Sequence, residues 1–146
     1  MKKIRSSKKG FTLAELLIVV AIIGVLVGIS IPIFSAQLEK SREATDIANL
    51  RAAKAAAVSL YLTGDGKEDY VTWTDANDAS KGFTAYYDAN DGKLVKTAPS
   101  VKYGEGTSAT GSDSNKLFNY TPGTVASGKV IKVVVNDAGA CTFSWE

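Results

Sequence analysis

The chain has 146 residues, of which 45% are hydrophobic and 22% charged, with a formal net charge of +2. It contains no histidine and one cysteine, Cys141. This composition excludes Ser-His and Cys-His nucleophile pairs, the usual nitrogen or sulfur metal sites, and disulfides within the chain. We therefore expect no catalytic residue, no metal site and no cofactor.

The positive charge is concentrated in residues 1–10, a short polar segment. Five lysines and arginines precede Gly10, which leaves 12 basic and 15 acidic residues from Phe11 onward. Nucleic-acid-binding proteins usually present a basic face. Because the lysines of this mildly acidic remainder are scattered, we expect no direct nucleic-acid binding.

Residues 11–34 are apolar except for one charge, Glu15. As a helix this run would be about 36 Å long, enough to cross a hydrocarbon core of about 30 Å. The basic segment before it is typical of a cytoplasmic flank. A secretory signal fits poorly, because its apolar region is shorter and its small cleavage-site residue follows that region. Here the small residue, Gly10, precedes it.

Residues 35–63 continue the helical pattern. Alanines give this segment high helix propensity. Arg42 and Asp46 stand four apart, a spacing at which they could pair. Gly64 and Gly66 end the pattern, so we expect one helix over about 11–62. Its second half carries an apolar stripe made of Ile47, Leu50, Ala57, Val58 and Tyr61.

From residue 64 onward, short β-rich runs alternate with Gly, Asp, Asn and Ser. The sequence NDAG at 136–139 separates two of these runs and predicts a hairpin over 129–145. The string DAND occurs at 75–78 and 88–91, and turn chemistry explains it better than a calcium loop does, because Gly92 stands at the fifth position instead of the sixth. The strand candidates are 83–87, 93–95, 117–121, 129–135 and 140–145.

Three features of this region stay open. Calcium binding near 75–78 and 88–91 is not settled by the pattern alone. Residues 104–115 have the composition of a surface loop, whose glycosylation the sequence does not decide. Cys141 is interpreted as a small buried apolar side chain, with an intermolecular bridge as the alternative.

Glu15 needs an explanation, because a carboxylate on a lipid-facing helix costs about 2.5–3.5 kcal/mol. Cleavage after Gly10 would create an α-amino group on Phe11, positively charged near neutral pH. That amine, on the same chain or on a neighbouring copy, could neutralise Glu15. The alternative is a tolerated charge near the membrane interface.

Two further features of the apolar run suit helix assembly. Gly24 and Gly28 form a small-xxx-small pair, which lets apolar helices approach closely. Pro32 removes a backbone donor and crowds the carbonyl of Gly28. We expect the helix to be softest here, as a place to bend or unwind.

The run KKGFTLAELLIVVAIIGVLVGISIP resembles the N-terminal signature of type IV prepilins and the related pseudopilins. The resemblance implies that a prepilin peptidase cuts between Gly10 and Phe11 and methylates the new amine of Phe11. It places Glu15 at the family's acidic assembly position and Pro32 at its helix-kinking proline. It also implies an α+β fold, in which a long N-terminal helix packs through its C-terminal half against a small antiparallel sheet.

The resulting hypothesis divides the chain into a prepilin leader (1–10), a hydrophobic transmembrane and assembly helix (11–34), an amphipathic half-helix (35–63) and a C-terminal β-sheet region (64–146). By the resemblance, the chain is a structural subunit of a type IV pilus that serves adhesion, motility or DNA uptake. Its partners would be other copies of itself, the prepilin peptidase, and the assembly platform with its ATPase. It would lie in the bacterial cytoplasmic membrane as a precursor and on the cell surface when assembled.

Two alternatives remain. One is a pseudopilin of a type II secretion or competence machine, which would share every N-terminal feature. The other is a membrane-anchored receptor or enzyme that never polymerises. The resemblance also raises a question about stability, because many pilins close their C-terminal loop with a disulfide that this chain cannot form.

Overall fold

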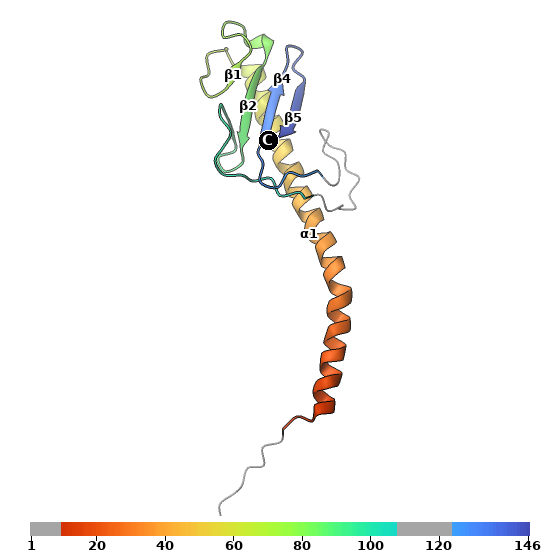
Figure 1. Ribbon diagram of the computed structural model, residues 1–146. Coiled ribbons are helices and arrows are strands. Elements are labelled where there is room, and N and C mark those ends of the chain that lie inside the picture. Colours follow the sequence, from red (N-terminus) through yellow and green to blue (C-terminus); the bar gives the residue numbers. More distant parts are fainter. Residues whose placement is uncertain (1–9, 108–123) are drawn as a thin grey trace, which may run out of the picture. The chain divides into compact units, whose positions relative to one another are not determined.

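The computed structural model describes residues 10–107 and 124–146 (Figure 1). The elements follow the order of a long helix and then strands, which confirms the predicted α+β class. They are helix α1 (Leu13–Thr63), β1 (Thr72–Trp73), the 3₁₀ helix η1 (Ala79–Lys81), β2 (Phe83–Asp88), β3 (Lys93–Val95), β4 (Ile131–Val135) and β5 (Cys141–Trp145). The chain forms two compact units, Met1–Ser35 and Ala36–Glu146, which we describe separately.

In the first unit, α1 is apolar on every side. The large apolar side chains from Phe11 to Phe34 are 47% to 87% exposed. By length and composition, α1 can cross a membrane. Surface of this kind is stable in lipid or against other helices, not in water.

α1 ends where the sequence predicts. Gly64 donates a backbone hydrogen bond to the carbonyl of Leu60 (2.7 Å). A Cβ at Gly64 would lie 2.7 Å from that carbonyl oxygen and 2.8 Å from the Trp73 ring, so only glycine fits at this position after the end of the helix. Gly66 then takes a φ of +82°, a conformation that side chains disfavour.

In the second unit, the strands form one five-stranded sheet with the order β1-β2-β4-β5, and β3 also pairs with β2. All pairings are antiparallel. Phe83 lies opposite Val135, and Val133 lies opposite Phe143, which fixes the register through the centre of the sheet. The predicted hairpin is confirmed as β4 and β5. β1 and η1 were not predicted, and the candidate strand 117–121 lies outside the described residues.

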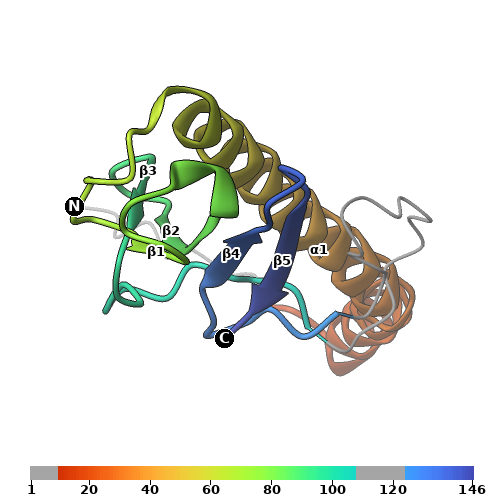
Figure 2. The ribbon, with the colours of Figure 1, turned by 90° about the horizontal axis from the view of Figure 1, so that it is seen from above.

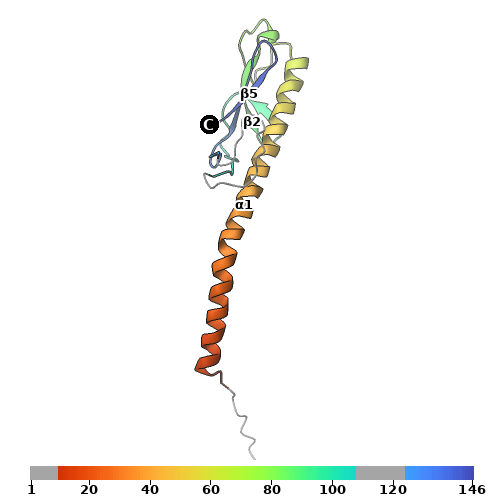
Figure 3. The same cartoon turned by 90° about the vertical axis from the view of Figure 1, so that its right-hand side faces the viewer.

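One face of this sheet packs on the part of α1 from Ala36 to Thr63 (Figures 2 and 3). Burial alternates along β2 and β4, as expected for strands with one covered face. Ala53 and Ala57 are fully buried on the helix side, and such small side chains let the layers approach closely. Of the predicted helical stripe, Ile47, Leu50 and Ala57 are buried, whereas Val58 is 37% exposed and was wrongly included. The remaining core is Leu60, Val71, Phe83, Ala85, Tyr87, Leu94, Ile131, Val133 and Val135.

The two DAND strings form turns, as predicted. Asp75, Asp78 and Asp88 each accept a hydrogen bond from the backbone N–H two residues further on, at 2.9, 3.0 and 2.9 Å. This is the usual way in which aspartate stabilises a tight turn.

Candidate functional site

The N-terminus of α1 is closed by a reciprocal pair of side chains. Glu15 Oε2 accepts hydrogen bonds from the backbone N–H of Thr12 (2.7 Å) and from its hydroxyl (2.8 Å). In return, Thr12 Oγ1 accepts from the backbone N–H of Glu15 (3.2 Å). This arrangement is a capping box, and it also places a negative charge at the positive end of the helix dipole.

The capping box changes the interpretation of Glu15. From the sequence we interpreted an amine, on the same chain or on a neighbouring copy, as the group that could neutralise its carboxylate, but we did not foresee that Thr12 within the same chain donates two hydrogen bonds to it. The spacing Thr-x-x-Glu was the available signal. Charge is a separate matter. Among residues 10–107 and 124–146, no cation lies within ion-pair distance of Glu15.

The proposed cleavage site precedes this cap. Gly10 and Phe11 lie outside the helix, and Phe11 is 87% exposed. A shallow groove of about 510 Å³ is lined by Phe11, Glu15, Leu16, Ile18 and Val19. The geometry therefore presents an accessible peptide bond, an apolar groove and a carboxylate in one short segment.

Gly24, Gly28 and Pro32 all lie within α1, which continues without interruption through the proline. A Cβ added at Gly24 or Gly28 would meet no other atom within 4 Å, so both positions are open to an approaching helix. Proline lacks the N–H that would bond the Gly28 carbonyl. The expected softening at this point stays a prediction.

Three buried carboxylates on α1 are a feature that sequence reasoning missed. Glu39 is 2% exposed, Glu43 is 3% exposed, and Asp46 is fully buried. Asp46 accepts hydrogen bonds from the backbone N–H groups of Glu105 (2.9 Å) and Gly106 (2.7 Å). Arg42 does not form the pair with Asp46 that their spacing would allow, and instead pairs with Glu39 at 3.3 Å.

Glu39 holds the same loop. Its Oε1 accepts a hydrogen bond from the backbone N–H of Thr107. Burial alone would raise the pKa of Glu39, but the Thr107 hydrogen bonds and the Arg42 guanidinium outweigh it, and the net pKa is lowered. Glu39 and Asp46 thus fix residues 105–107 to the helix.

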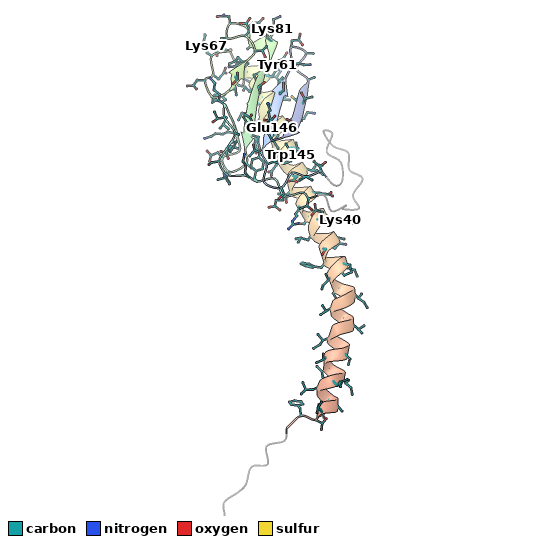
Figure 4. The ribbon with its side chains drawn as sticks, in the orientation of Figure 1. Lys40, Tyr61, Lys67, Lys81, Trp145 and Glu146 are labelled. Atoms are coloured by element: carbon teal, nitrogen blue, oxygen red, sulfur yellow. The ribbon has the colours of Figure 1, made fainter. Side chains whose placement is uncertain are left out.

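The C-terminal hairpin is held without a disulfide. The backbone of Glu146 exchanges two hydrogen bonds with Val130, at 2.8 and 3.0 Å, and its carboxylate pairs with Lys132 at 2.9 Å. Tyr61, labelled with Glu146 in Figure 4, donates its hydroxyl hydrogen to the Asp137 carbonyl (2.9 Å). These contacts fasten both ends of the hairpin.

Tyr103 and Cys141 complete the packing around the hairpin. The Tyr103 hydroxyl donates to the Tyr87 carbonyl (2.7 Å) and accepts from the Ile131 N–H (2.8 Å). Cys141 is partly buried against the core, and burial raises the pKa of its thiol. This environment suits the apolar role expected for that cysteine.

Comparison with known proteins gives consistent results. Residues 5–31 match the family described as the prokaryotic N-terminal methylation motif. Fimbrial protein EcpC of Eikenella corrodens is 31% identical over 143 residues, which cover 98% of this chain and 84% of EcpC. Type IV major fimbrial protein FimA of Dichelobacter nodosus is 32% identical over 100 residues, covering 68% of this chain and 64% of FimA. Type IV major pilin protein PilA of Myxococcus xanthus is 42% identical over 62 residues, covering 42% of this chain and 28% of PilA.

Proposed function

Since this chain belongs to the type IV pilin family, we propose that it is a structural subunit of a type IV pilus that polymerises through its N-terminal helix. Residues 1–10 would be the leader, 11–34 the membrane and assembly segment, 35–63 the amphipathic half-helix, and 64–146 the sheet region. The relatives named above are fimbrial proteins and pilins, so a pseudopilin is not favoured. We propose a structural role, not catalysis.

The accessible segment before α1 supports the proposed processing. A prepilin peptidase would cut between Gly10 and Phe11, both outside the helix, and methylate the Phe11 amine. Removal of residues 1–9 with Gly10 would take away five positive charges and leave the new amine one residue before the capping threonine. The membrane would hold the precursor, and the assembly platform with its ATPase would then extract the mature chain into a surface filament.

One observation carries the proposed assembly contact. The Glu15 carboxylate is hydrogen-bonded by Thr12, yet none of the described residues forms an ion pair with it. Apolar surroundings make an uncompensated charge costly. An amine on Phe11 of a neighbouring subunit would neutralise this charge and fix the register between copies. Capping alone would require no neighbour.

Two substitutions separate the capping role from the charge role. Glu15→Gln keeps an acceptor for Thr12, since glutamine also serves in capping boxes, but it removes the charge. Thr12→Val removes the cap and keeps the charge. We expect Glu15→Gln to enter the membrane and be processed, but to give at least about tenfold less sheared filament, the loss of a buried pair being worth about 3–5 kcal/mol.

The measurement is the amount of this chain in sheared filaments and in the membrane fraction, with mass spectrometry of the N-terminal peptide in each. A methylated peptide starting at Phe11 in wild-type filaments would support processing and polymerisation together. If Glu15→Gln gave as much sheared filament as wild type while Thr12→Val gave little, Glu15 would act only as a helix cap. A processed peptide confined to the membrane fraction would instead favour a pseudopilin.

A further inference from the structure

A groove lies along one edge of the sheet in the Ala36–Glu146 unit. Its volume is about 530 Å³, within the range of ligand-sized pockets, and it lies between the last turns of α1, the loop that follows α1, and β3. Among the described strands, β3 pairs only with β2, at the side of the sheet opposite β5 (Figure 2). This β3 groove therefore borders a strand that has one neighbour.

The register of the sheet decides which way the backbone of Leu94 points. Between β2 and β4, the Tyr103 hydroxyl bridges the Tyr87 carbonyl (2.7 Å) and the Ile131 N–H (2.8 Å), so the backbone carbonyl of Tyr87 faces β4. Backbone groups alternate in direction along an antiparallel strand, so the residues on either side of Tyr87 bond to β3 and Tyr87 does not. Leu94 lies opposite Tyr87, and its N–H and C=O therefore point away from β2.

These two backbone groups of Leu94 have no hydrogen-bond partner within residues 10–107 and 124–146. The side chain of Leu94 is 4% exposed and belongs to the core cluster, and the residue also lines the β3 groove. A strand edge that presents both a donor and an acceptor is a template for pairing with another extended chain. The chemistry of this edge thus points to a polypeptide backbone as the ligand.

The wall of the groove that faces β3 leaves room for a side chain. It is formed by one face of α1, where three small residues surround Leu60, namely Ala56, Ser59 and Thr63. Because Leu94 packs in the core against α1, the side chain of a residue paired with Leu94 would also face α1. An aliphatic side chain suits this position, since it would be buried against Leu60.

Lys93 favours an acidic residue at the next position. In an antiparallel addition, the ligand residue that follows the aliphatic one lies opposite Lys93, in a non-hydrogen-bonded pair whose side chains are close together. The Lys93 side chain is 60% exposed and pairs with Asp91 at 2.7 Å. A surface ion pair of this kind contributes little, so an acidic ligand residue can share or replace it. Opposite charges at such facing positions stabilise strand pairing.

We propose that the β3 groove binds an extended segment of another protein, which adds to the sheet as an antiparallel strand beside β3. An aliphatic residue of that segment exchanges two backbone hydrogen bonds with Leu94 and places its side chain against Leu60. The acidic residue that follows it pairs with Lys93. A second copy of this chain does not offer this pattern, because no acidic residue outside α1 directly follows an aliphatic one.

The test uses the full chain in detergent micelles, followed by NMR of labelled amide and leucine methyl groups. The probe is the peptide acetyl-Thr-Ile-Asp-Thr-amide. We expect saturable shifts at the Leu60 and Leu94 methyls. At about 90% saturation, hydrogen exchange at the Leu94 amide should be about tenfold slower, because only the unbound tenth exchanges. The amides of Lys93 and Val95, which already face β2, should exchange as before.

Three changes test the separate contacts. N-methyl-isoleucine in the probe removes the donor that faces the Leu94 carbonyl and should weaken binding at least about fivefold. Asparagine in place of the aspartate should weaken binding by up to about fivefold, the range of a cross-strand charge pair. Ser59→Phe would fill the groove and should abolish binding, whereas Ala48→Phe, at an exposed helix position outside the lining, should leave it unchanged.

Several results would overturn the proposal. They are equal binding of the parent and N-methylated probes, wild-type binding by Ser59→Phe, and no saturable shift at tens of millimolar probe. Exchange at the Leu94 amide without probe is equally decisive. If it were slow and became faster on dilution, a second copy would cover β3, and if it were slow at every concentration, the chain would cover β3 itself; either result excludes the assigned partner.

Discussion

Replacing Asp46 by asparagine should destabilise the Ala36–Glu146 unit strongly, although the two side chains have nearly the same volume. Asp46 is fully buried, and its two oxygens accept from two different backbone N–H groups, those of Glu105 and Gly106. Asparagine has one acceptor oxygen, so its amide NH₂ would face one of these donors. The backbone N–H of Glu105 or of Gly106 would then lack an acceptor, and the asparagine NH₂ facing it is itself a donor.

The magnitude follows from these contacts. Each hydrogen bond to a charged group contributes about 1.5–3 kcal/mol, and leaving a buried donor without an acceptor costs about 1–3 kcal/mol. Removing the buried charge offsets part of this loss. We therefore expect Asp46→Asn to lower the free energy of unfolding by about 2–4 kcal/mol, and Tm by about 8–16 °C at roughly 4 °C per kcal/mol.

The assay is thermal unfolding of the full chain in detergent micelles, followed by near-ultraviolet circular dichroism of Trp73 and Trp145. Thr45→Ala is the control, because this exposed hydroxyl only bonds the Ser41 carbonyl one turn back. The control should change stability by less than about 0.5 kcal/mol. An Asp46→Asn variant as stable as that control would show that the paired acceptors do not hold the loop.

Two more predictions concern the same unit. The pKa of Glu39 is lowered from its ordinary value of 4.5, so its contribution to stability is present above that pH and is lost as pH falls through the folded pKa. Glu39→Gln should therefore be less stable than wild type at neutral pH, and its Tm should fall less steeply as the pH is lowered. If Tm fell equally steeply with pH in the variant and in wild type, the role given to Glu39 would be contradicted. Tyr103→Phe leaves the Ile131 N–H without its acceptor and should cost about 1–3 kcal/mol in urea unfolding. The matched control is Tyr86→Phe, which removes only a solvent-exposed hydrogen bond to the Glu146 carboxylate and should cost less than about 0.5 kcal/mol. Equal effects of the two tyrosine substitutions would refute the role given to Tyr103.

Much of the fold could be predicted because its signals are local. We predicted a helix over about 11–62 from the apolar run, the alanine-rich segment after it and Gly64. The observed helix begins two residues later and ends one residue later than predicted. Phe83 to Tyr87 and Lys93 to Val95 were predicted as strands because β-branched and aromatic residues alternate there between turn residues. β1 was missed because two residues carry no period.

What the sequence did not reveal depends on distant partners. Glu39 and Asp46 are acidic residues on an amphipathic helix, and such residues usually face water. Their burial depends on backbone N–H groups at 105–107, which lie 59 to 68 residues further along the chain. No helical periodicity encodes that contact. The role of Thr12, by contrast, was available in a four-residue motif and was overlooked.

The alternation along β2 and β4 has a consequence for how this protein can change over evolution. Phe83, Ala85 and Val133 face α1 and constrain one another. Thr84 and Val134 lie opposite each other on the other face, and neither belongs to the core cluster. Mutations can accumulate on that face while the framework that supports it stays intact. The exposed face of the sheet can therefore vary in sequence without disturbing the packing of the sheet on α1.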